Sequence, residues 1–155
     1  MTPNHVASLT SAVIYHDAKA ALDWLERAFG FDRSLVLTGP DGAVVHAEMR
    51  HGNGRLMVGG LWADFIASPA DVGGKNTQSV HVQIASDIDA HCARAREAGA
   101  TILQEPENQF YGDRTYRALD LEGHVWNFRE TVREVPQSEQ EAATGLKWRT
   151  RPQGD

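Results

Sequence analysis

Hydrophobic and polar positions predict a strand, a helix and three further strands in the first part of the chain. Apolar residues recur with helical spacing over Ala18–Phe29, between a typical N-cap, Asp17, and a typical C-cap, Gly30. Clustered or alternating apolar residues predict the strands Leu9–Tyr15, Phe31–Thr38, Ala43–Arg50 and Arg55–Gly60. This order defines a first βαβββ module over about residues 8–60.

The same order of elements returns after a linking loop at residues 61–78. A helix is predicted over Ile88–Ala98, after the N-cap Asp87 and before Gly99. The predicted strands are Ser79–Ala85, Thr101–Glu105, Arg114–Leu119 and Val125–Arg129. The two N-caps are 70 residues apart, so we expect a duplicated supersecondary motif with a second module over about residues 79–130.

Length and composition fit one folded domain followed by a polar tail. The chain has 155 residues, of which 41% are hydrophobic, and this is enough for a packed core. We therefore expect a single α+β domain over residues 1–130. Residues 131–155 have no sustained apolar period and form a C-terminal tail, in which Ser138–Ala143 is a candidate short helix.

Charge and residue usage narrow the partners and the compartment. The formal net charge of −6 argues against a nucleic acid partner, because phosphate binding needs a basic surface. The one cysteine, Cys92, excludes an internal disulfide and a cysteine metal cluster, and its helical position predicts burial. No segment has the features of a membrane span or a signal peptide, so we expect a cytoplasmic protein that does not bind membranes.

Six short segments of the second module carry a family resemblance. In chain order they are Ser79–Ile84, Asp87–His91, Ala98–Ala100, Glu105–Pro106, Tyr111–Arg114 and Asp120–Phe128. Their order and spacing resemble the vicinal oxygen chelate superfamily, which includes glyoxalases, bleomycin-resistance proteins and extradiol dioxygenases. The bleomycin-resistance-like branch is the most similar. The resemblance extends over about residues 8–130, and Leu121 replaces the proline that is usual in the last motif.

The resemblance implies a fold and a place for a ligand. Each module would curl its mixed sheet, and the two modules together would form a cup with the helices on its outer face. A small molecule would bind in the cup, and some members of the family complete the cup across a homodimer. The superfamily includes lyases, isomerases and dioxygenases, so the resemblance leaves open whether this chain is an enzyme.

The metal positions of the family can be carried onto this chain one at a time. They fall on Thr10 and near Gly59 in the first module, and on His81 and Asn127 in the second. Only His81 is a good ligand, and catalytic metal sites typically have three protein ligands. No cofactor is therefore expected. The alternative is a divalent metal held by His81 with His46 or Glu48 from the neighbouring strand, with His81 and Glu48 as candidate catalytic residues.

Alternation along the strands selects the side chains that face the cup. On the strand around His81, apolar residues alternate with His81 and Gln83, and on the last strand Trp126 and Phe128 alternate with Asn127 and Arg129. The candidate ligand-binding residues are His81, Gln83, Asn127, Arg129, Tyr111, Arg114, Tyr116, His46, Glu48 and Trp62.

Several of these candidates also have structural interpretations. His81 fits a hydrogen-bonded cup residue as well as a ligand contact. Arg114 fits a salt bridge with a carboxylate such as that of Asp120 slightly better than an anion contact. Trp62, with Phe65, fits either a lid or an anchor of the linking loop. His124 fits a turn residue with a structural hydrogen bond.

Three hypotheses about function follow. The first is a cytoplasmic homodimer that binds a small aromatic or polar molecule in its cup without a catalytic metal. The second is a lyase, isomerase or dioxygenase that uses His81 with Glu48 or His46. The third is a small structural or regulatory domain that binds another protein.

Overall fold

The computed structural model describes residues 7–149 and contains both expected modules. Module one comprises β1 (Ser11–Ile14), α1 (Ala18–Phe29), β2 (Asp32–Thr38), β3 (Val44–His51) and β4 (Gly54–Gly59). Module two comprises β5 (Val80–Gln83), α2 (Ile88–Glu97), β6 (Thr101–Asn108), β7 (Asp113–Leu119) and β8 (Val125–Thr131). The prediction of an α+β fold with two tandem βαβββ modules is confirmed.

The two sheets have the same topology. Their strand orders are β1-β4-β3-β2 and β5-β8-β7-β6, and in each sheet the first strand runs parallel to the last strand of its module. The remaining neighbours are antiparallel. In each module the helix and the two strands after it form the long connection that the parallel pairing requires.

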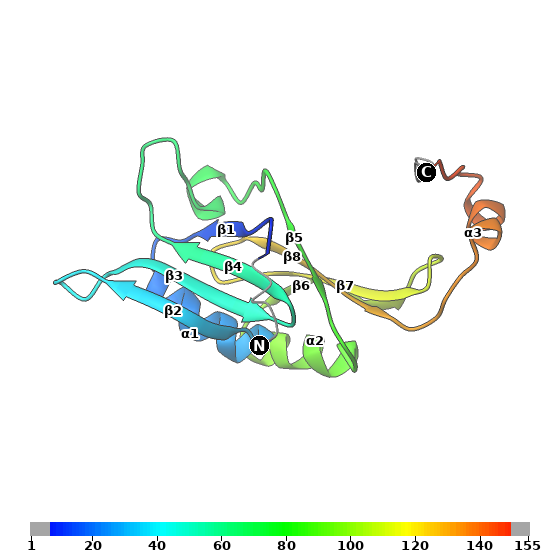
Figure 1. Cartoon of the computed structure of the whole chain (residues 1–155), viewed down its shortest axis with the longest axis horizontal. Helices are drawn as coiled ribbons and strands as arrows, with labels where there is room; N and C mark the ends of the chain where they lie inside the picture. The colour runs from blue at the N-terminus through cyan, green and yellow to red at the C-terminus, as the bar shows by residue number, and fades with distance from the viewer. Residues whose placement is uncertain (1–6, 150–155) are drawn as a thin grey trace.

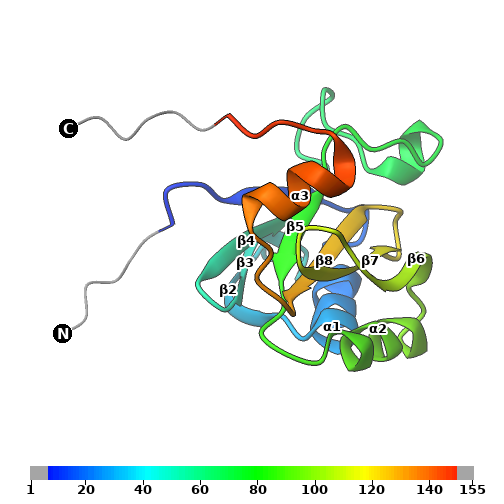
Figure 2. The ribbon, with the colours of Figure 1, turned by 90° about the vertical axis from the view of Figure 1, so that its right-hand side faces the viewer.

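The helices cover one face of the sheets, and the core lies beneath them. Figures 1 and 2 show α1 and α2 side by side, in contact with each other, on one side of the two sheets. Asp17 and Asp87 cap the helices as predicted, each accepting a hydrogen bond from a backbone N–H of the first turn. Large side chains that are fully buried include Tyr15, Leu22, Leu25, Phe29, Met49, Val58, Ile88, Tyr116, Trp126 and Phe128.

Polar contacts join the two modules through this core. The Tyr15 hydroxyl donates to Oδ2 of Asp120 at 2.6 Å. Nε2 of His91 lies 2.9 Å from the Phe29 carbonyl oxygen, and the indole of Trp24 donates to a carbonyl of module two. His124 bonds the Ile14 carbonyl through Nε2 at 2.7 Å, which confirms its predicted structural role. Contacts between the helices and contacts between the ends of the strands therefore both join module one to module two.

Two segments lie outside the modules. The linking loop carries one 3₁₀ turn, η1 (Pro69–Val72), and the tail carries α3 (Gln137–Thr144), close to its predicted position. In Figure 1, α3 projects beyond the end of the β6–β7 hairpin. The tail starts against this hairpin, where Val132 and Arg133 both donate to the carbonyl of Gly112. In residues 7–149, no helix combines the length and apolar character needed to cross a bilayer.

Candidate functional site

The open face of module two is the sheet surface opposite α2. The alternating residues Val82, Trp126 and Phe128 are buried toward the helices, as predicted. Their neighbours therefore point the other way. The residues placed on the open face are His81, Gln83, Asn127 and Arg129. The alternation in the sequence predicted all four positions correctly.

A row of polar side chains crosses this open face. His81 pairs with Asn127 on β8, Asn127 pairs with Arg117 on β7, and Arg117 pairs with Gln104 on β6. Directly paired residues of neighbouring strands share a face, so the four side chains form one line across the sheet. We call this line the polar row.

Arg117 and Asn127 are hydrogen-bonded within the polar row. Nε of Arg117 donates to Oδ1 of Asn127 at 2.7 Å. Because a guanidinium has no acceptor atom, the oxygen of the Asn127 amide must face it. The amide nitrogen of Asn127 and the terminal nitrogens of Arg117 keep their N–H groups for another partner. Arg117 and Asn127 thus present donors, whereas Gln104, whose amide nitrogen donates to Thr115, keeps its oxygen as an acceptor.

A pocket adjoins the polar row at the junction of the two modules. It has a volume of about 560 Å³ and lies between the β3–β4 hairpin and β5, within the range typical of small-molecule sites. We call it the junction pocket. Its apolar walls include Phe31, Met49, Leu56, Val82 and Trp126. Its polar lining includes Arg50, Arg55, His81, Gln83 and Arg129. His81, Gln83 and Arg129 therefore belong both to the open face and to the junction pocket.

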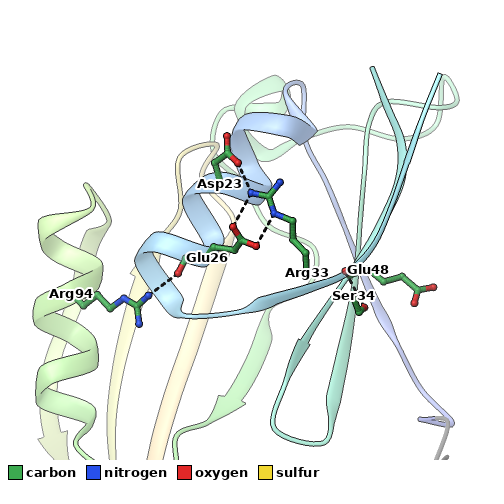
Figure 3. A network of polar contacts seen from close by, with 6 residues as sticks. All are labelled: Asp23, Glu26, Arg33, Ser34, Glu48 and Arg94. Carbon is green, nitrogen blue, oxygen red and sulfur yellow. Dashed lines mark hydrogen bonds and ion pairs between the residues drawn. The ribbon is translucent and has the colours of Figure 1, made fainter. Parts of the chain in front are cut away.

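The open face of module one carries the other polar candidates. His46 and Glu48 are half-buried, with Nε2 of His46 3.4 Å from Oε1 of Glu48, and Arg55 lies 3.7 Å from the same carboxylate. Figure 3 shows the Glu48 side chain pointing away from α1. On the helix side, Arg33 donates hydrogen bonds that lower the pKa of Glu26. His46 and Glu48 belong to a different sheet from His81.

Two predicted contacts of the ligand lie on the helix side instead. Tyr116 is buried in the core, where its hydroxyl is 2.5 Å from Nδ1 of His91, and burial raises the pKa of Tyr116. Arg114 forms a bidentate ion pair with Asp89 on α2 at 2.9 and 3.0 Å. The predicted salt bridge of Arg114 is therefore present, but its partner is Asp89 and not Asp120. The prediction that these two side chains face the cup is wrong, because β7 points its even-numbered residues toward α2.

The two remaining aromatic candidates lie outside the junction pocket. Tyr111 is 40% exposed in the β6–β7 turn and packs edge-on against Phe110. Trp62 is 67% exposed in the linking loop and packs edge-on against Phe65, 5.2 Å between ring centroids. Neither lines the junction pocket. The lid function of Trp62 stays a prediction.

Sequence reasoning missed Arg117 and Gln104. The signal for Arg117 was present, because Tyr116 and Ala118 are apolar and alternate with Thr115 and Arg117. For Gln104 the signal was weaker, since β6 has register shifts on both sides of this residue.

Comparison with known proteins identifies the family. The sequence model of the Glyoxalase/Bleomycin resistance protein/Dioxygenase superfamily matches residues 2–128. The chain belongs to this superfamily. An uncharacterised protein of Mycobacterium bovis is 31% identical over 147 residues, which cover 92% of this chain and 95% of the relative.

Solved structures of the superfamily fold agree with this assignment. TioX from Micromonospora sp. ML1 is 35% identical with a TM-score of 0.66, covering 82% of this chain and 100% of TioX. TnmS3, an antibiotic-binding protein from Streptomyces sp. CB03234, is 19% identical with a TM-score of 0.62, covering 82% of this chain and 98% of TnmS3. The likeness to TnmS3 shows the fold alone.

The donor set in this superfamily member does not fit a catalytic divalent metal. Asn127 has one atom able to coordinate a metal, its Oδ1, and that atom accepts the hydrogen bond from Arg117. The adjacent guanidinium would also repel a cation. Across residues 7–149, no three His, Cys, Asp or Glu side chains come together as a metal-binding group, and this includes the combination of His81 with His46 and Glu48.

The register of module one places the metal positions two residues from those expected. Val13 pairs with Val58 as Val82 pairs with Phe128, and all four are buried. The neighbouring pair Ala12–Met57 is therefore the counterpart of His81–Asn127. Thr10 and Gly59 are thus corrected to Ala12 and Met57. Neither an alanine methyl nor a methionine thioether suits a hard divalent ion.

Proposed function

We propose that this protein binds a small organic molecule in the junction pocket without a catalytic metal. The junction pocket carries the proposal, because apolar and aromatic walls beside a few polar groups are what a small-molecule site needs. The ligand would place its apolar part against Phe31 and Trp126, and its polar part near His81 and Gln83. The antibiotic-binding protein TnmS3 is a precedent for ligand binding by this fold.

The proposal includes a cytoplasmic homodimer. On the edge strand β2, Leu35 and Leu37 pair with Glu48 and His46 and therefore share their open face. They are 40% and 49% exposed, so a second copy packed on the open face would bury apolar surface and enclose the ligand. Light scattering at several concentrations tests this. A mass of one chain, 17.1 kDa, at all concentrations would contradict the dimer.

Ligand binding is tested with a neutral fluorescent probe, N-phenyl-1-naphthylamine. We expect it to bind the wild-type protein, because its rings match the apolar walls. Ala85→Trp places a large side chain at the lining of the junction pocket, and it should weaken probe binding by about tenfold or more. Ala43→Trp is the matched control, since Ala43 is exposed in the β2–β3 turn and away from the pocket. Equal binding by both variants would contradict the proposal.

The metal-dependent alternative is tested by elemental analysis. Protein purified without chelators and without an affinity tag is compared with the His81→Ala variant for bound nickel, zinc, manganese and iron. We expect less than one metal ion for every ten chains in both. A stoichiometric ion that the His81→Ala variant loses would instead support a lyase, isomerase or dioxygenase that joins His81 to His46 and Glu48 across a dimer.

A further inference from the structure

We infer that Arg117, with the Asn127 amide and His81, binds an anionic oxygen group of the ligand, such as a carboxylate, sulfonate or phenolate. This inference rests on the proposed function and names the chemical class of its ligand. The ligand would have an apolar body for the junction pocket and an anionic end for the polar row.

The hydrogen-bonding state of the polar row defines the kind of group it accepts. Asn127 turns its oxygen toward Arg117, so its NH₂ group is left to donate outward. The terminal nitrogens of Arg117 can only donate. Among the described residues, neither of these groups has another hydrogen-bond partner, and His81 has none. A ligand that contacts Arg117 and Asn127 must supply acceptor atoms.

The charge of Arg117 favours a negative acceptor over a neutral one. Two arginines that border the open face have carboxylate partners, since Arg129 lies 3.9 Å from Asp113 and Arg55 lies 3.7 Å from Glu48. Arg50, which lines the junction pocket, has no ion pair among residues 7–149. Arg117 has no such ion pair among residues 7–149. Its guanidinium is held in place by Asn127 but is not neutralised, and this is how an arginine binds a carboxylate or sulfonate.

The polar row and the junction pocket share one residue, His81. His81 lines the junction pocket and is also paired with Asn127 in the row. Trp126 points to the helix side and Arg117 to the open face, so a ligand that contacts both would pass around the edge strand β5 at His81. The geometry therefore selects amphipathic anions and disfavours compounds that are apolar throughout.

Two fluorescent probes with the same aromatic body separate these contributions. 1-Anilinonaphthalene-8-sulfonate carries an anion, and N-phenyl-1-naphthylamine does not. For Arg117→Gln, we expect the dissociation constant of the sulfonate probe to rise about tenfold or more, because a charge-assisted contact is lost. The dissociation constant of the neutral probe should change less than about twofold. Arg27→Gln removes the same charge from the exposed side of α1, and both probes should bind it as they bind wild type.

The outcomes separate the inference from the function on which it rests. If wild type binds neither probe, the proposed function is wrong. If wild type binds both and Arg117→Gln weakens neither, or weakens both equally, the anion site at Arg117 is wrong while the proposed function stands. Arg117→Lys keeps the charge but not the planar donor group, and it should bind the sulfonate probe more tightly than Arg117→Gln. If the two variants lose affinity for the sulfonate probe equally, the charge of Arg117 does not contribute to binding.

Discussion

The hydroxyl of Tyr15 lies 2.6 Å from Oδ2 of Asp120, and this buried contact joins module one to module two. Asp120 also accepts from the indole N–H of Trp126 and from the backbone N–H groups of Glu122 and His124. These four donors satisfy the oxygens of the buried Asp120 side chain. Burial, followed by the Asp120 charge, raises the pKa of Tyr15, so the phenol remains a donor.

Tyr15→Phe removes one donor from Asp120 without creating a large cavity. We expect the free energy of unfolding to fall by about 1–3 kcal/mol, the usual value of a buried hydrogen bond to a charged group. Urea denaturation followed by fluorescence measures it. Tyr111→Phe is the control, because Tyr111 is 40% exposed and its hydroxyl has no partner among the described residues. A loss below about 0.5 kcal/mol in Tyr15→Phe would show that this contact does not hold the modules together.

A second contact between the modules makes stability depend on pH. Nε2 of His91 donates to the Phe29 carbonyl, so Nδ1 accepts from the hydroxyl of Tyr116, and the ring is neutral. Burial lowers the pKa of His91 from its ordinary value of 6.5. The unfolded chain therefore binds a proton more readily than the folded chain. Stability from this group is complete above about pH 6.5 and is lost as the pH falls below that value.

This dependence is measured as the urea midpoint at pH 7.5, 6.5 and 5.5. We expect the midpoint of wild type to decrease from pH 6.5 to pH 5.5, with no change above about pH 7 from this group. His91→Gln keeps a donor for the Phe29 carbonyl but does not titrate, so its midpoint should change less over the same range. The carboxylates with lowered pKa values, such as Asp71 and Asp89, titrate below this window. Identical pH profiles for the two proteins would contradict the assignment.

Most of the fold followed from local signals in the sequence. The caps Asp17 and Asp87, the stop at Gly30 and the alternation on β5 and β8 each act within one element, so the sequence expresses them directly. Strand ends were less certain, because pairing determines them: β1 begins at Ser11, where its pairing with Leu56 begins, and not at Leu9.

The candidate site was predictable only where alternation was clear. His81 and Asn127 came from a clean period of two, whereas the candidates Arg114 and Tyr116 on β7 lie on the helix side of the sheet. The junction pocket had no sequence signal. It depends on the approach of the β3–β4 hairpin to β5, and side chains of both modules determine that approach.

The β6–β7 turn is sensitive to any side chain at position 112. Gly112 has φ +98°, and a Cβ there would lie 2.0 Å from the Arg133 carbonyl oxygen. Gly112→Ala should therefore displace the start of the tail and lower the free energy of unfolding by more than about 2 kcal/mol. Gly42→Ala is the matched control: its φ is +80°, but no atom lies within 4 Å of the added Cβ.

In Gly42→Ala only the strain of a positive φ should lower the free energy of unfolding, by about 1 kcal/mol. Denaturation curves for the two variants and wild type give the difference directly. If Gly112→Ala is no less stable than Gly42→Ala, the tail does not pack against the turn as the contacts indicate.

Arg114 and Arg117 lie three residues apart on β7 but on opposite faces, so only the substitution of Arg117 should weaken binding of the sulfonate probe. Arg114→Gln breaks an exposed ion pair with Asp89, so its urea midpoint should change little. Its binding of 1-anilinonaphthalene-8-sulfonate should match that of wild type. Arg114 pairs with Asp89 on α2, and the polar row lies on the opposite face of the sheet. Arg117→Gln should bind the sulfonate probe more weakly while its urea midpoint changes little. Titration and denaturation of both variants measure these effects, and weaker sulfonate binding by Arg114→Gln would mean that β7 presents its other face to the ligand.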